Sequence, residues 1–467
     1  MKNFLKSLIA LSMALVMLLS MAACSEKDNS QSVDNDFFTD DEVQIGTDSG
    51  SDKIESTESD GEDKTNSVGG KSWEEVLASM PKKLRGTKIT VANWNPVSEY
   101  TGASTAIKEF EKQTGIKVDW VTIDYGVYTT RLATMVASNT APDVVRTRTP
   151  NPAWMQSFQS IDAAKFDFSD AAWNQTLMKD YTVNGITYAT SLNNTHIGSV
   201  DMLFYNKDLI SKYNYEDPYK LWKSGQWNMS KFINMCKDFK KDSGEDFGCV
   251  GIYWQGWTQL YGVAGPVGYD GTKYFSNLGD SKFLTVTQKV ADWYNTDRVF
   301  AVGRAEFFDA SQALFYAGGS VYLRRNNSYF GSLKASGTLY AVPMPSIDGQ
   351  SSYYQGKDEY EAYAIAKGAK NPEAVPYFLR YYLDGENYDL NAFFCNKQNL
   401  EVYRWCMSQK NTIWSTYFEN ADDTFGDGKT GICSLQGNQI KSFVDSNKYM
   451  IDNRVNKFNS LLGQLEK

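Results

Sequence analysis

Residues 87–94 (TKITVANW), 116–123 (IKVDWVTI) and 142–146 (PDVVR) are three short segments rich in apolar and β-branched residues, which favour strands. Residues 106–115 and 128–138 lie between them and have the apolar spacing of amphipathic helices. The order strand, helix, strand, helix, strand predicts an α/β fold with a mostly parallel sheet and helices on both faces. In such a sheet, ligands bind beyond the carboxyl ends of the strands.

Other elements are predicted on both sides of this unit. Ser72 and Glu75 form a capping-box pattern that begins a short helix ending at Met80. Asn184 and Gly185 favour a hairpin turn, and residues 199–205 favour a strand that leads into a helix. Further helices are expected at 227–241, 283–294, 310–317, 372–383, 402–418 and 440–465.

Residues 1–24 have the features of a lipoprotein export signal. Lys2 and Lys6 precede an apolar stretch at 4–19 that is short for a membrane span, and small residues precede Cys24. The stretch resembles a bacterial lipobox, with Met21 where Leu is usual. We therefore expect Cys24 to be lipidated at the start of the mature chain. The alternative is an ordinary secretory signal followed by a free cysteine.

Residues 25–70 are polar and acidic, with 14 Asp and Glu against three Lys. Such a composition cannot bury enough apolar surface to offset the entropy of ordering, so we expect a disordered acidic tether. The whole chain carries a net charge of -9, so its acidity is concentrated in this tether. The expected role of the tether is to hold the folded body away from an anionic envelope.

Composition excludes several functions for residues 71–467. This part has no net charge and no basic cluster longer than pairs such as Arg324 and Arg325, so it has no electrostatic footprint for nucleic acid. His196 is the only histidine, which excludes multi-histidine metal sites and most histidine-based catalysis. Five cysteines remain after Cys24, without CxxC spacing, so at least one thiol is expected to be free. We expect no metal and no cofactor.

Six segments of the chain together carry a resemblance to a known family. They are 131–145 (RLATMVASNTAPDVV), 184–189 (NGITYA), 203–209 (LFYNKDL), 225–230 (GQWNMS), 308–318 (FDASQALFYAG) and 363–383 (YAIAKGAKNPEAVPYFLRYYL). In this order they resemble the extracellular solute-binding proteins, family 1, over nearly the whole body of the chain. Members of that family are the lipid-anchored receptors of ABC sugar importers, and the maltose-binding protein is one of them.

The resemblance implies a two-lobed periplasmic-binding-protein-like fold of type II, with a ligand cleft between lobes that hinge strands join. It places the N-lobe at 86–198 plus 364–394 and the C-lobe at 199–363 plus 395–467. Closure of two lobes around a hydroxylated ligand would exclude water and strengthen polar contacts.

Candidate ligand-binding residues follow from the strand ends and from the family pattern. Trp94 and Asn95 end the first strand, and Glu99 follows in the loop. Of Arg146 and Arg148, we expect only one to face the cleft readily, and the family pattern favours Arg148. The alternative for Trp94 is a core role, and that for Arg148 is a surface salt bridge.

The remaining candidates come from segments where the resemblance places ligand contacts. Trp254 and Trp257 occupy the segment in which relatives stack an aromatic ring on a sugar, and a core role is the alternative for each. A structural role is the alternative for His196. The full group is Asn194, His196, Trp254, Trp257, Tyr322, Arg324, Tyr360 and Glu361.

Three functions compete. The favoured one is a receptor that binds a carbohydrate, expected to be an oligosaccharide, and passes it to ABC permease subunits without catalysis. A chain with 12 Trp and 29 Tyr suits sugar stacking, although composition alone does not distinguish this from a tyrosine-rich core. The rivals are a surface glycoside hydrolase with paired carboxylates and a glycan sensor or adhesin. We expect a monomer held at the cell surface by its lipid alone.

Overall fold

In this computed structural model the chain divides into two units, residues 1–62 and 63–467, and all described residues belong to the second unit. The expected signal and Cys24 lie outside the described residues, as does the tether up to residue 68. The structure describes residues 69–99, 102–148, 150–193, 199–252, 254–263, 265–270, 272–324, 329–359, 361–384, 394–409, 412–414 and 431–465.

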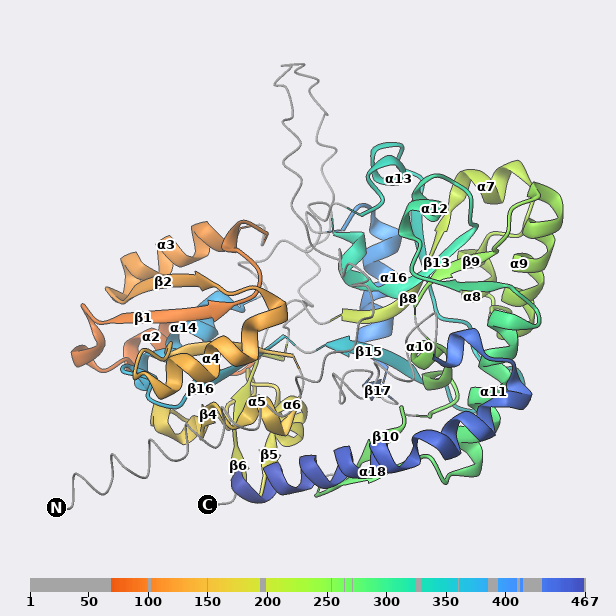
Figure 1. The fold of residues 1–467 in the computed structure, drawn as a ribbon. Helices are drawn as coiled ribbons and strands as arrows, with labels where there is room; N and C mark the ends of the chain where they lie inside the picture. Colours follow the sequence, from red (N-terminus) through yellow and green to blue (C-terminus); the bar gives the residue numbers. More distant parts are fainter. Residues whose placement is uncertain are drawn as a thin grey trace, which may run out of the picture. The chain divides into compact units, whose positions relative to one another are not determined.

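The first sheet has six strands in the order β2-β1-β3-β16-β4, with β7 paired to β16 (Figure 1). β1 runs parallel to both β2 and β3, which confirms the predicted strand–helix alternation. β16 is antiparallel to β3 and comes from a much later part of the chain. The strands are β1 (Lys88–Asn93), β2 (Lys117–Thr122), β3 (Val144–Thr147), β4 (Phe158–Gln159), β7 (Ala189–Thr190) and β16 (Ala362–Ala366).

Helices cover both faces of the first sheet, because successive strand residues point to opposite sides. Val91 and Val144 pack in one core cluster, and the next residues along each strand, Ala92 and Val145, pack in another. The first cluster includes side chains of α3 (Ala103–Thr114) and α14 (Val375–Tyr382), and the second includes side chains of α4 (Tyr128–Ala137) and α5 (Pro152–Met155). Both faces are therefore apolar, as a parallel sheet requires.

Short elements complete this part of the chain. Asn184 and Gly185 join β5 (Thr182–Val183) to the antiparallel β6 (Ile186–Thr187), which confirms the predicted hairpin. The others are η2 (Lys82–Leu84), η3 (Val97–Glu99), η4 (Tyr125–Val127), η5 (Ile161–Ala164), α6 (Gln175–Asp180) and η7 (Pro372–Ala374).

The second sheet has seven strands in the order β12-β9-β13-β8-β15-β17, with β14 paired to β8 (Figure 1). β8 is buried along all eight of its residues and lies between β13 and β15. The strands are β8 (Ser199–Asn206), β9 (Cys249–Gly251), β12 (Phe300–Val302), β13 (Phe315–Gly319), β14 (Leu339–Pro343), β15 (Gln355–Glu359) and β17 (Thr412–Trp414). A separate hairpin pairs β10 (Val267–Tyr269) with β11 (Tyr274–Ser276).

Several helices belong to this half of the chain. Asn228 caps α9 (Met229–Ser243), where Met235 and Cys236 are buried in the core as expected. The others are α7 (Lys207–Lys212), α8 (Pro218–Lys223), α10 (Trp254–Gln259), α11 (Ser281–Asn295), α12 (Ala305–Asp309), η6 (Ser320–Leu323), α13 (Gly331–Ala335), α16 (Lys397–Met407), η9 (Ile432–Ser434), η10 (Gly437–Gln439) and α18 (Ile440–Leu465).

Two helix predictions are wrong. The expected helix at 310–317 is replaced by a loop and by β13, whose five residues are all buried. A short, continuous apolar run suits a buried strand as well as a helix, so its periodicity does not decide. The expected helix at 402–418 begins earlier and ends at Met407, and Thr412–Trp414 forms β17 against β15.

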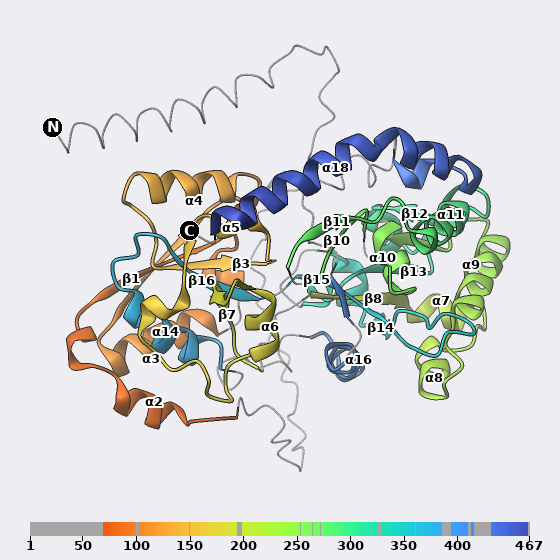
Figure 2. The ribbon, with the colours of Figure 1, turned by 90° about the horizontal axis from the view of Figure 1, so that it is seen from below.

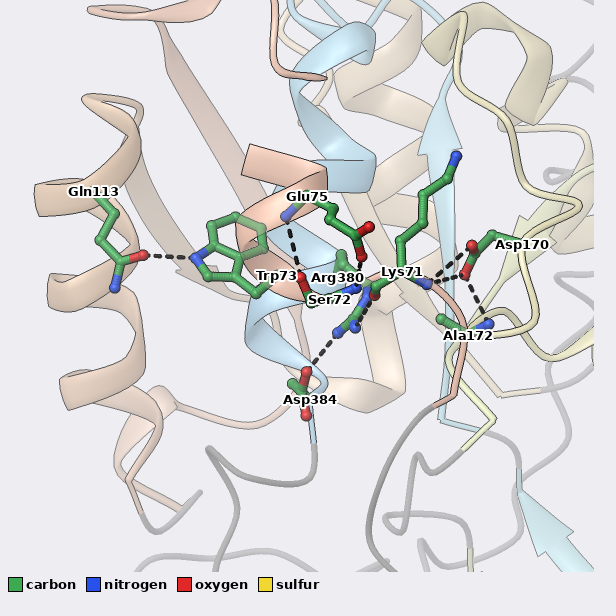
Figure 3. A network of polar contacts seen from close by, with 9 residues as sticks. All are labelled: Lys71, Ser72, Trp73, Glu75, Gln113, Asp170, Ala172, Arg380 and Asp384. Carbon is green, nitrogen blue, oxygen red and sulfur yellow. Dashed lines mark hydrogen bonds and ion pairs between the residues drawn. The ribbon is translucent and has the colours of Figure 1, made fainter. Parts of the chain in front are cut away.

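The described chain begins with a segment that is bonded to Arg380 on α14 and to Asp170 in the loop between η5 and α6 (Figure 3). The backbone N–H of Lys71 donates to Asp170, and the Lys71 carbonyl accepts from Arg380 Nη2 at 2.9 Å. Arg380 is also paired with Asp384. Ser72 and Glu75 form the predicted capping box of α2 (Trp73–Ser79). Hydrogen bonds to Asp170 and Arg380 thus hold the segment that follows the expected tether.

α18 connects elements that are distant in sequence (Figure 2). It packs on α11, on β11 through Phe458 and Asn459, and on α5. Gln156 Nε2 donates to the Leu461 carbonyl, and the Tyr188 hydroxyl donates to the Leu465 carbonyl, each at 2.9 Å. Within the described residues no helix is both long and apolar enough to cross a membrane. All five cysteines of the described region are free thiols.

The chain passes three times between the two sheets. The first passage leads from β7 to β8, the second from β15 to β16, and the third from β16 by way of α14 and α16 to β17. β7 pairs with β16 in the first sheet, and β8 pairs with β15 in the second. The first two passages therefore start and finish on neighbouring antiparallel strands. Only Tyr360 and Glu361 separate β15 from β16.

Candidate functional site

The carboxyl edge of the first sheet brings together residues from three strands. β1 ends at Asn93 and is followed by Trp94, and β3 ends at Thr147 and is followed by Arg148. β16 runs in the opposite direction, with Ala362 opposite Thr147, so Glu361 lies at the same edge. Three candidates from the sequence are thus gathered where a parallel sheet places its ligands.

Trp94 is half-buried among aromatic rings. Its ring meets those of Tyr125, Tyr128 and Trp154 edge to face, with centroids 5.5, 5.2 and 6.1 Å apart. The guanidinium carbon of Arg146 lies 4.1 Å from the centroid of the Trp94 ring. Such contacts hold a large ring in one orientation while part of it stays accessible.

Arg146 is the buried cation of this edge. Its Nη2 lies 2.8 Å from Glu361 Oε2, and both side chains are only 1% exposed. Arg146 Nη1 also lies 3.4 Å from Asn93 Oδ1, and the Tyr363 hydroxyl donates to Glu361 Oε1. A buried charge requires such a partner, because desolvation of a lone ion is very costly. The partners of Glu361 are therefore protein side chains in this structure, which gives it a structural role that the sequence did not suggest.

Arg148 is the more accessible of the two arginines. Its Nη1 donates to the Tyr125 hydroxyl at 2.6 Å, and its guanidinium carbon lies 5.3 Å from the Tyr125 ring centroid. Residues two apart on a strand project to the same side, so both arginines can share this edge. They differ in solvent exposure because Arg146 belongs to β3, while Arg148 lies beyond the end of that strand.

The backbone N–H and the backbone carbonyl of Asn95 are both hydrogen-bonded. Its N–H donates to Asn93 Oδ1, and its carbonyl accepts from Trp120 Nε1, each at 3.0 Å. The residue is half-buried. These bonds fix the backbone that follows Trp94.

Trp254 and Trp257 are placed in the core and not at an exposed edge. Their side chains are 0% and 1% exposed. The Trp257 ring stacks on Phe300, and its Nε1 lies 3.1 Å from the Tyr294 hydroxyl. Because neither indole has an accessible face, neither can stack on a ligand in this conformation. The contacts describe the core role that the sequence left as the alternative.

Tyr322 and Arg324 follow the carboxyl end of β13. Gly319 at that end pairs with Asp201 near the start of β8, so both residues lie towards the passages between the sheets. Tyr322 packs against the rings of Tyr316 and Tyr329. Arg324 forms an isolated bridge with Phe394.

Tyr403 on α16 is buried and is influenced electrostatically by both Arg324 and Glu361. Burial raises the pKa of the Tyr403 hydroxyl on α16, with smaller effects from Arg324, which lowers it, and Glu361, which raises it. Arg324 and Glu361 are thus both within electrostatic range of this one residue. Of the other predicted site residues, Asn194, His196, Tyr360 and the side chain of Glu99 lie outside the described residues.

Tyr125 and Tyr128 were not among the residues predicted from the sequence, and Arg146 was considered there but passed over in favour of Arg148. The Tyr128 hydroxyl lies 2.9 Å from the Ala92 carbonyl and 3.1 Å from the Arg146 carbonyl, so it bridges the ends of β1 and β3. Both tyrosines follow β2, and the strand-end rule already applied to Trp94 would have found them. The partner of Arg146 is far away in sequence and left no local signal.

The arrangement suits recognition of a neutral, hydroxylated ligand. It offers a partly exposed indole for stacking and a guanidinium fork in Arg148 for hydrogen bonds. Among the described residues, no group of three or more His, Cys, Asp or Glu is placed to hold a metal ion.

A family model for bacterial extracellular solute-binding proteins matches residues 93–388. No curated protein sequence matches the chain. Solved structures match with low identity. The GacH receptor of Streptomyces glaucescens, solved unliganded and with acarbose, is 15% identical, with a TM-score of 0.56, and the match covers 81% of this chain and 98% of that one.

Two further structures give similar values. MalE3 of T. maritima, with bound maltose, is 16% identical at a TM-score of 0.56, and the match covers 78% of this chain and 100% of that one. An ABC substrate-binding protein of Listeria monocytogenes, in complex with cycloalternan, is 15% identical at a TM-score of 0.54, with coverage of 81% and 99%. At this identity the likeness shows the fold, which is the expected two-lobed, periplasmic-binding-protein-like fold of type II.

Proposed function

This chain belongs to the bacterial extracellular solute-binding proteins, and we propose that it binds an oligosaccharide at the carboxyl edge of its first sheet. The observation that carries the proposal is Trp94, a half-buried indole at a strand end whose orientation Arg146 and three aromatic rings fix. A preoriented aromatic ring stacks on a sugar at little cost in conformational entropy. The similar structures with acarbose, maltose and cycloalternan support this ligand class.

The proposal assigns the second contact surface to the other lobe. Tyr322 and Arg324 follow β13 at the end of the second sheet that is near the passages. A ligand held between these residues and Trp94 would be enclosed by both lobes. We place the lobe boundaries between residues 198 and 199 and between residues 363 and 364.

Delivery to ABC permease subunits and a lipid anchor at Cys24 complete the proposal. The family model describes extracellular proteins, and the start of the chain has the features of a lipoprotein signal. Replacement of Cys24 by Ala is expected to move the protein from the membrane fraction to the medium with its thermal stability unchanged. Membrane retention of the Cys24→Ala protein would refute the anchor.

The binding test is calorimetric titration with maltose, acarbose and cycloalternan, followed by a wider glycan panel. A ligand at a hundredfold excess over its dissociation constant should stabilise the protein by about 2.7 kcal/mol. Trp94→Ala should weaken binding by about 1.5–3 kcal/mol, the burial energy of a large side chain. Trp222→Ala, which removes another half-buried indole on α8, is the matched control and should leave binding unchanged.

Two outcomes would contradict the proposal. One is a glycan panel without any binding, and the other is equal weakening by Trp94→Ala and Trp222→Ala. The proposed role makes and breaks no bond, so glycans recovered after long incubation should be intact. Shortened products would favour the rival glycoside hydrolase.

A further inference from the structure

The guanidinium of Arg146 connects Trp94, the ring proposed to contact the ligand, to the β15–β16 passage. Arg146 lies over Trp94, bonds Asn93 at the end of β1, and pairs with Glu361. Glu361 is one of the two residues between β15 and β16.

Contacts with the first sheet fix one end of the β15–β16 passage. Glu361 contacts Arg146 and Tyr363, and both of these belong to the first sheet, where they are opposite each other in register. On the other side, Glu359 pairs with Ser199 of the second sheet, next to an irregularity in the register. A rotation of one sheet against the other has to be accommodated where the chain crosses between them, and Glu361 lies on one of these crossings.

We propose that Arg146 is a positioning residue that couples ligand contact at Trp94 to the geometry of the β15–β16 passage, through its ion pair with Glu361. This rests on the proposed binding of a ligand at Trp94. A ligand on the accessible part of Trp94 displaces water from the edge, which strengthens the charge interactions of Arg146. Because coupling is reciprocal, a firmer ion pair also favours the ligand-bound state.

The coupling needs the shape of arginine as well as its charge. A flat guanidinium can lie over an indole and at the same time direct two nitrogens to Glu361 and Asn93. A lysine has one compact ammonium and cannot maintain all three contacts. Arg146→Lys should therefore keep the charge pair and lose the connection to Trp94.

The test is amide hydrogen exchange on the full chain, first without ligand. In Glu361→Gln, which keeps the side-chain shape, amides of residues 361–366 should exchange faster by at least about tenfold, because a buried charge loses its partner. Amides of α3 should be unchanged. Glu373→Gln is the matched control, since Glu373 pairs with Lys83 and Lys165 at the surface of the same part of the fold. It should leave residues 361–366 at the wild-type rate.

The second measurement separates this proposal from the proposed function. Acarbose, at concentrations that calorimetry shows to saturate each protein, should slow exchange at residues 361–366 in the wild type and much less in Arg146→Lys. If acarbose binds neither protein, the ligand choice fails, and the ligand-free comparison still decides whether Glu361 holds the passage. Wild-type exchange at 361–366 in Glu361→Gln, or an equal rise there and in α3, would overturn the positioning role. Equal protection by acarbose in the wild type and in Arg146→Lys would overturn the coupling.

Discussion

Trp257 stacks on Phe300 with ring centroids 4.3 Å apart and ring planes only 6° from parallel. The Phe232 ring lies 5.5 Å from Trp257 and 5.7 Å from Phe300, so the three rings form one aromatic cluster contributed by α9, α10 and β12. The cluster joins helices and sheet in the second half of the chain. Its position explains why the most tryptophan-rich segment of the sequence does not contribute to the candidate site.

Trp257→Ala should therefore affect folding. Loss of a fully buried indole leaves a cavity, and the expected decrease in the free energy of unfolding is about 3–5 kcal/mol. Urea denaturation measures it. Trp94→Ala, at a half-buried position, should cost clearly less stability. Equal stability of Trp257→Ala and the wild type would contradict the core assignment.

Tyr125→Phe tests how Arg148 is oriented. The change removes the hydroxyl that accepts from Arg148 Nη1 and keeps the ring beneath the guanidinium. Ligand binding should weaken by about two- to tenfold, the range of one hydrogen bond. Calorimetry with the best glycan of the panel measures this. Tyr219→Phe, which removes a hydroxyl that is bonded to Glu401 elsewhere, is the control and should bind normally.

Gly70→Ala tests the fastening of the first described residues. Gly70 has φ +68°, and an added Cβ would lie 1.9 Å from Asp170 Oδ1. Limited proteolysis should then cut within residues 71–79 sooner than in the wild type. Gly86→Ala provides the control, because Gly86 has a similar φ of +80° and no atom near the added Cβ. Identical cleavage in all three proteins would show that Asp170 does not hold this segment.

Lys334 predicts a stability change at alkaline pH. Burial lowers the pKa of its ammonium to about 8, while Cys395 and Asp309 act in the opposite direction. Between pH 8 and about 10.4, the ordinary lysine value, the unfolded state holds more protons than the folded state, so this group makes the free energy of unfolding rise with pH. Below pH 8 both states are protonated and the cost of burial is fully present.

The measurement is the difference between wild type and Lys334→Met, because buried thiols act against this trend. Burial raises the pKa of Cys236 and Cys249, so both lose stabilising protonation relative to the unfolded state as pH rises. Lys334→Met should be more stable than the wild type at pH 7, and its advantage should shrink towards pH 10. A constant difference across this range would contradict the lowered pKa.

Local signals predicted much of the fold. The first three strands, the helices between them and the capping box at Ser72 are confirmed, because each depends on residues close in sequence. The helix expected at 310–317 failed since its apolar run lacks a distinguishing period. The insertion of β16 between β3 and β4 follows from the family resemblance and not from local pattern.

The site was less predictable, for physical reasons. A strand end pointed to Trp94 and the family pattern to Arg148, and the structure places both residues at the carboxyl edge of the first sheet. The ion pair of Arg146 and Glu361 joins residues from distant segments, so neither position alone indicates it. Trp254 and Trp257 are three apart on a helix and share a face, and this spacing was the available signal for burial. The neighbouring sequence does not show whether such a helix face packs in the core or lines a cleft.

β16 is synthesised long after its neighbour β3, and this has a consequence for folding during biosynthesis. β3 ends at Thr147, and its neighbour β16 begins at Ala362, so about 200 residues must be made before the first sheet can be completed. At about 5–20 residues per second this takes roughly 10–40 s. Throughout that interval the edge of β3 presents unpaired N–H and C=O groups that could join a strand of another chain. A nascent chain of this protein is therefore expected to need protection from aggregation until the ribosome has passed Ala366.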